Sequence, residues 1–157
     1  MINKISGAEG TSRDLLAVTW MNENNFKPYP GPNTNGYNGD YKTEGYMHWD
    51  VGPFHINIGY TLAAIADGSA KWPKGADKYG VFGYTFYDPS GKTPTNTFDG
   101  VPFQNGQMAA QRLNGLGSND RERAVNYAGQ KNGPARGRSY DTWHNAFANF
   151  FKCYRGY

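Results

Sequence analysis

The strongest constraint on the fold is an apolar helix, predicted over residues 12–22, that runs directly into Glu23. Leu16, Trp20 and Glu23 are spaced i, i+4 and i+7, so they share one face of this helix. Apolar neighbours disfavour the charged form of a carboxyl group, and a general acid that works near neutral pH requires this. The helix alone fits a surface glutamate at a fraying end equally well, so the rest of the chain must decide.

The middle of the chain is rich in turn-forming residues and predicts long loops around short extended segments. Residues 27–45 contain three Pro and four Gly, which is typical of a long ordered loop, and loops of this length tend to be functional. Residues 49–60 predict an extended piece, and a helix is expected from Tyr60 to Ile65. The alternating aromatics of residues 79–87 predict a β-hairpin that turns at residues 88–91, or a mobile flap.

The last third of the chain predicts three helices. They are expected over residues 104–116, over residues 120–128 behind an Asn119 cap, and from Ser139 or Asp141 onward. In the last helix, aromatic side chains at helical spacing predict a core-facing stripe of Trp143, Phe147, Phe150, Phe151 and Tyr154. The lone Cys153 is expected to be buried beside it. Residues 1–10 predict an irregular lead-in. The whole chain, 1–157, is therefore expected to form one domain of the α+β class, mostly α.

Composition limits the partners. The chain has 12 Tyr, 9 Phe and 4 Trp, and these flat rings suit stacking on sugars as well as a core. Its net charge of +3 favours anionic surfaces, yet it has no Lys/Arg run of the kind that nucleic-acid binders carry. One cysteine excludes an intrachain disulfide, and no segment predicts a membrane span or a signal peptide. We expect a monomer without cofactor, metal or nucleic acid, which either leaves its cell without a signal peptide or is a mature or excised domain.

Four motifs in order resemble the goose-type lysozyme and soluble lytic transglycosylase group of the lysozyme-like superfamily. The family's Glu-Ser-x-Phe corresponds to residues 23–26, with Asn24 in place of Ser. Its Gly-Leu-Met-Gln-Ile-Asn corresponds to residues 52–57, with His55 in place of Gln. Residues 105–113 resemble its later helix, and residues 124–129 resemble its Ala-x-x-Tyr-Asn-x-Gly element. The resemblance spans residues 12–130.

The resemblance implies a lysozyme-like fold with a small β-hairpin or extended section beside an active-site cleft. It also implies a protein that is secreted or acts on a cell wall, as a phage lytic enzyme or as an excised or mature domain. It implies that Glu23 protonates the glycosidic oxygen between N-acetylmuramic acid and N-acetylglucosamine in peptidoglycan. An inverting hydrolase (muramidase) also needs a second carboxylate about 6.5–9.5 Å away, for which Asp50, Glu44 and Asp40 are candidates. A lytic transglycosylase needs none, because the 6-hydroxyl of the sugar attacks. Residues expected to contact the substrate are Asn24, Trp49, Phe54, His55, Ile56, Asn57 and Tyr127.

Alternatives remain open. A chitinase of the same fold would cut a related N-acetylated repeat in chitin oligosaccharides. A non-catalytic lysozyme-like protein would bind glycan or cell wall without cutting, and the departures at Asn24 and His55 keep this alternative. His48, Asp50 and His55 have a spacing that could suit a metal, but no fourth ligand stands out, so no metal site is predicted.

Overall fold

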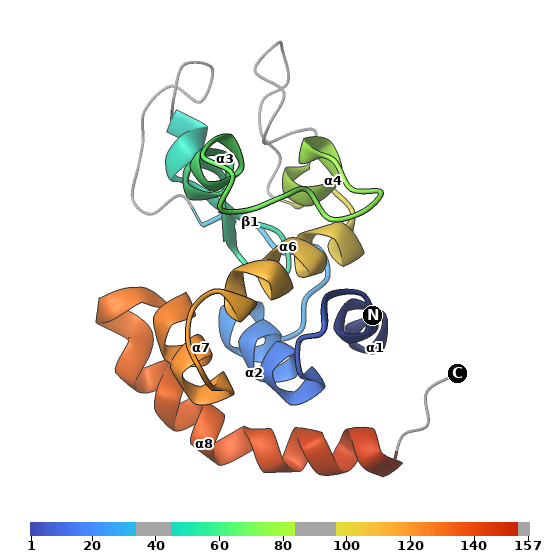
Figure 1. The fold of residues 1–157 in the computed structure, drawn as a ribbon, viewed down its shortest axis with the longest axis vertical. Coiled ribbons are helices and arrows are strands. Elements are labelled where there is room, and N and C mark those ends of the chain that lie inside the picture. Colours follow the sequence, from blue (N-terminus) through green and yellow to red (C-terminus); the bar gives the residue numbers. More distant parts are fainter. Residues whose placement is uncertain (34–44, 84–96, 154–157) are drawn as a thin grey trace. The chain divides into compact units, whose positions relative to one another are not determined.

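The computed structural model describes residues 1–33, 45–83 and 97–153, which are mostly helical with one small antiparallel sheet (Figure 1). The chain divides into two compact units, unit 1 (Met1–Asn25 and Ala109–Tyr157) and unit 2 (Phe26–Met108). Helix α6 (Pro102–Asn114) begins in unit 2 and ends in unit 1. The coarse class predicted from sequence, mostly α with a small β element, is therefore confirmed.

Unit 1 is built around α2 (Arg13–Asn24), whose residues 15–19 are all buried. Helix α1 (Ile2–Glu9), α7 (Asp120–Tyr127) and the long α8 (Gly129–Cys153) pack against it (Figure 1). Five consecutive buried positions cover more than one face of a helix, so α2 is the central helix of this unit. The predicted helix over residues 12–22 is confirmed, and it extends two residues further.

The irregular lead-in predicted for residues 1–10 is wrong, because this stretch forms α1. Its Ile5 is fully buried, and Gly10 ends the helix with a left-handed φ of 70°. The Asn114 side chain donates to the Glu9 carbonyl at 2.9 Å, and the Thr11 hydroxyl donates to the Asn114 side-chain oxygen at 3.0 Å. These contacts come from residues about a hundred positions away, so local sequence could not show them.

Unit 2 contains the sheet, in which β1 (Asp50–Val51) pairs with β2 (Ile56–Asn57) in antiparallel register. The 3-10 helix η1 (Gly45–His48) precedes this hairpin, and α3 (Ile58–Ala66) follows it directly. The Asn57 side-chain oxygen caps α3 by accepting the Tyr60 backbone N–H at 2.9 Å. The helix expected after the extended segment is confirmed, with α3 beginning two residues earlier. The extended piece predicted over residues 49–60 is confirmed only at the two short strands, because residues 52–55 form a turn and residues 58–60 are helical.

The hairpin predicted over residues 79–91 is wrong in its first part. Residues 78–82 form a short helix, α4 (Lys78–Phe82), which the Asp77 side chain caps by accepting the Gly80 N–H at 2.7 Å. The alternating aromatics therefore hid a helix whose start is fixed by a local cap. The remainder of the predicted hairpin lies outside the described residues.

Near the C-terminus, the predicted helices over 104–116 and 120–128 are confirmed as α6 and α7. The Asn119 cap is confirmed too, since its side-chain oxygen accepts the Glu122 N–H at 3.0 Å. The predicted start of the last helix at Ser139 or Asp141 is wrong, because α8 begins at Gly129 and passes through Pro134. The low helix propensity of its Gly-rich first half is overridden by packing against α7.

The aromatic stripe on α8 is not a core element. Trp143 is 47% exposed and Phe150 is 55% exposed, while Phe147 and Phe151 are half-buried. Tyr154 lies outside the described residues. Cys153, predicted to be buried, is exposed at the end of α8. Helical spacing shows which side chains share a face, but it does not show whether another element covers that face.

None of the described helices is both long and apolar enough to cross a membrane.

Candidate functional site

Glu23 lies in the last turn of α2, as the sequence predicted. Asn25 ends the helix in the left-handed region with φ 55°, and its N–H donates to the Met21 carbonyl at 2.9 Å. Asn tolerates this conformation better than most residues, because its short polar side chain can bond locally. The Glu23 side chain is 14% exposed. The side chain is therefore largely shielded from water.

The charged partner of Glu23 comes from α8. Arg136 Nη2 lies 3.6 Å from Glu23 Oε1, and the Arg136 side chain is 28% exposed. Two further contacts hold α8 against α2. The Ser139 hydroxyl donates to the Asn22 side-chain oxygen at 2.8 Å, and the Tyr140 hydroxyl donates to Asp14 at 3.2 Å. Unit 1 therefore supplies both the carboxylate and its cation from two helices that are linked at several points.

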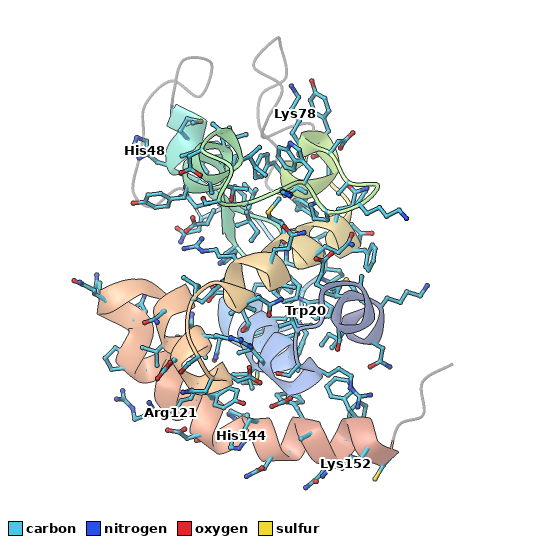
Figure 2. All side chains as sticks on the ribbon, viewed as in Figure 1. Trp20, His48, Lys78, Arg121, His144 and Lys152 are labelled. Atoms are coloured by element: carbon cyan, nitrogen blue, oxygen red, sulfur yellow. The ribbon has the colours of Figure 1, made fainter. Side chains whose placement is uncertain are left out.

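The α8 side of this arrangement is also tied to α7. Arg121 binds the Asp141 carboxylate through Nε and Nη2 at 2.8–3.0 Å (Figure 2). This hydrogen bond lowers the pKa of Asp141. Burial and then the nearby charge of Asp14 raise the pKa of Tyr140, so its hydroxyl stays protonated as a donor.

Of the predicted substrate residues, Asn24 and Tyr127 belong to unit 1. Asn24 follows Glu23 in α2 and is half-buried. Tyr127 ends α7 and is 7% exposed, and the Arg112 guanidinium carbon lies 5.0 Å from the centre of its ring. Such a cation–π contact helps to fix the ring at the end of its helix.

Asp50 and Asn57 meet across the hairpin of unit 2. The Asn57 side-chain amide donates to Asp50 Oδ1 at 2.9 Å and to the His48 carbonyl at 3.4 Å, while its oxygen caps α3. Both ends of the Asn57 side chain are therefore engaged in holding the hairpin to its neighbours. This shows that one Asp50 oxygen has a structural partner.

The turn between the two strands is supported by a residue that was predicted only as the start of a family helix. Asn105 is fully buried in α6, and its amide donates to the carbonyls of Val51 at 3.0 Å and Val81 at 2.8 Å. Its oxygen accepts the Phe54 N–H at 3.1 Å. One side chain thus satisfies three backbone groups and fixes the turn that the resemblance places in the substrate groove.

The side chains around this turn differ in accessibility. Phe54 and Ile56 are 0% exposed, so both side chains pack in the core, and neither presents a surface to a sugar. His55 is half-buried with a left-handed φ of 47°, and Trp49 is half-buried. The substrate contact predicted for the side chains of Phe54 and Ile56 is therefore corrected, whereas the His55 side chain in the same turn stays partly exposed.

The other candidates, for the second carboxylate and for a metal site, add no further residues to the candidate site. Glu44 and Asp40 lie outside the described residues. Within the described ranges, no group of three or more His, Cys, Asp or Glu side chains is arranged to hold a metal ion. Sequence reasoning missed Arg136 as the partner of Glu23, although the basic pair Arg136 and Arg138 is visible in the sequence.

Comparison with known proteins adds no assignment: no family model, no curated protein and no solved structure matches this chain.

Proposed function

We propose that this protein has a lysozyme-like fold and cleaves the β-1,4 bond between N-acetylmuramic acid and N-acetylglucosamine in peptidoglycan. The observation that carries this proposal is Glu23 itself. It is a mostly shielded carboxyl group at the end of the central helix of unit 1, with an arginine from another helix beside it. Together with the four ordered motifs, this supports Glu23 as the general acid of a glycan-cleaving site.

In the proposed reaction, the Glu23 carboxyl group gives its proton to the glycosidic oxygen as the bond from that oxygen to the sugar carbon breaks. The electron pair of this bond stays on the leaving oxygen, and positive charge develops on the sugar ring. The Glu23 carboxylate then takes a proton from the incoming hydroxyl group. This restores the acid for the next cycle.

We favour the transglycosylase form, in which the 6-hydroxyl of the sugar attacks and gives a 1,6-anhydro product. The reason is the state of Asp50, the strongest described candidate for a second carboxylate. One of its oxygens already accepts a hydrogen bond from the Asn57 side-chain amide, so Asp50 has a structural role in joining the two strands of the hairpin. An inverting hydrolase would need this carboxylate, or else Glu44 or Asp40, to activate a water molecule.

The test is product analysis with purified peptidoglycan and with chitin oligomers. Wild type, Glu23→Gln and the control Glu9→Gln are incubated with each substrate, and mass spectrometry identifies the products. Glu9 is also a glutamate near the end of a helix, on α1. We expect anhydro ends from peptidoglycan, a loss of about 10²–10⁴-fold in rate for Glu23→Gln, and near-normal rates for Glu9→Gln.

The other outcomes each decide against part of the proposal. Reducing ends would identify a muramidase, and faster cleavage of chitin oligomers would identify a chitinase. Binding of either polymer without any cleavage would identify a non-catalytic wall-binding protein. If Glu23→Gln forms the same products at the same rate as wild type, Glu23 is not the general acid.

A further inference from the structure

Arg136 and Glu23 form an ion pair that is largely removed from water. Their charged atoms lie 3.6 Å apart, and their side chains are 28% and 14% exposed. Charges interact more strongly where the surroundings are less polar than water, so this pair is coupled more tightly than a fully exposed pair. Removing Arg136 would take this charge interaction away from a carboxylate that is mostly shielded from water.

The backbone that carries Arg136 is held in place on both sides. At Gly133 an added Cβ would lie 2.9 Å from the Val125 carbonyl oxygen, and at Gly137 it would lie 2.9 Å from Val125 Cγ2. These two glycines let α8 lie directly against α7, one turn apart, with Arg136 between them in sequence. The next turn is fixed to α2 through Ser139 and Asn22. The guanidinium therefore projects from a position that leaves little freedom to its backbone.

The arginine also carries an unsatisfied group. Its Nε is buried and has no hydrogen-bond partner among the described residues. A buried donor without a partner destabilises the fold, so this arrangement is not what stability alone would select. Departures of this kind concentrate where a side chain serves a site.

From these observations we infer that Arg136 is a positioning residue for Glu23. It fixes the carboxyl group at the end of α2 and stabilises the carboxylate that forms when Glu23 gives up its proton. Arg136 remains a cation throughout and exchanges no proton. The inference rests on the proposed function, because it assigns a role within the same glycan-cleaving site.

The first experiment measures kcat and KM on peptidoglycan for Arg136→Met, Arg136→Lys and the control Arg138→Met. Arg138 is exposed on the same helix, so its removal changes the net charge equally. We expect Arg136→Met to lower kcat by about 10–100-fold with KM within about 3-fold, because the interaction is needed mainly as charge develops. Arg136→Lys should recover several-fold of the loss, and Arg138→Met should stay near wild type.

Two results would overturn the inference. One is a kcat for Arg136→Met no lower than that of Arg138→Met, and the other is a Lys variant as slow as the Met variant. Thermal unfolding checks that each variant is folded. If Arg136→Met does not fold, Arg136→Gln takes its place, since it keeps a polar side chain without the charge.

The second experiment does not depend on activity. A water-soluble carbodiimide with an amine labels carboxyl groups that the reagent can reach, and peptide mapping by mass spectrometry measures the rate at Glu23. We expect several-fold faster labelling of Glu23 in Arg136→Met than in wild type or Arg138→Met, and equal rates would refute the ion pair.

The two experiments separate the possible failures. If the wild type cleaves no glycan, the proposed function and the catalytic part of this inference are overturned. The labelling rate of Glu23 still tests the ion pair with Arg136 in that case. A wild type that depends on Glu23 but not on Arg136 overturns this inference alone.

Discussion

The Asn105 side-chain oxygen accepts the backbone N–H of Phe54 at 3.1 Å, which connects the first turn of α6 to the turn of the hairpin. The same side chain donates to the Val51 and Val81 carbonyls. Asn105→Ala leaves three buried backbone groups without their partner. We expect the free energy of unfolding to fall by about 2–4 kcal/mol in urea denaturation. Asn132 is exposed on α8, so Asn132→Ala serves as the control. It should change the free energy of unfolding by less than about 0.5 kcal/mol. Similar values for both variants would contradict the role of Asn105.

Gly52, in the turn of the hairpin, is expected to be harder to replace than Gly68, which follows α3. Its φ is 77°, and an added Cβ would lie 2.3 Å from Asn105 Nδ2. Gly68 has nearly the same φ, 81°, but nothing within 4 Å of its added Cβ. Gly68→Ala should therefore cost only the backbone strain, about 1 kcal/mol, whereas Gly52→Ala should cost at least about 2 kcal/mol more. Equal destabilisation of the two variants in urea denaturation would show that Asn105 moves aside freely.

Asp50→Asn separates a structural from a chemical role of this carboxylate. Asparagine keeps an oxygen that can accept the Asn57 amide, so the free energy of unfolding should change by less than about 1 kcal/mol. If Glu23 acts without a second carboxylate, the rate of peptidoglycan cleavage should stay within about 3-fold of wild type. A loss of about 100-fold with an intact fold would instead make Asp50 the base of a hydrolase.

Tyr140 should make the protein sensitive to alkaline pH. Its pKa is raised in the folded state, mainly by burial, so folding favours the protonated hydroxyl. This contribution to stability is complete below the unfolded pKa of about 10 and is lost as pH rises above it. Between about pH 10 and 11.5, wild type should lose stability faster than Tyr140→Phe, by up to about 1.4 kcal/mol per pH unit. Parallel stability curves for the two proteins in this range would contradict a raised pKa of Tyr140.

At neutral pH, Tyr140→Phe should lower the free energy of unfolding by about 1 kcal/mol, because the hydrogen bond to Asp14 is lost.

Local sequence signals were sufficient for some of these elements. The apolar run before Glu23 predicted α2, and the Asn119 cap predicted α7, because a helix face or a cap is encoded within a few residues. Helix α1 and the first half of α8 were missed for the opposite reason. Helix α1 is held by Thr11 and Asn114, and α8 runs through Gly133 and Pro134 because it packs closely on α7.

The candidate site divides in the same way. Glu23 could be placed at a helix end from its spacing to Leu16 and Trp20. Its partner Arg136 could not, since the two are more than a hundred positions apart and only the packing of α8 on α2 joins them. The burial of Phe54 was likewise hidden, because a turn residue facing inward has the same local pattern as one facing a groove.

The exposure of Cys153 offers a practical advantage. It is the chain's only cysteine, and it is the last residue of the 25-residue helix α8. A maleimide dye or spin label would therefore attach at one known point without any mutagenesis. Because α8 also carries Arg136, such a probe would lie on the same helix, at the end far from Gly129. Its signal would report whether this end of the helix shifts when glycan is added.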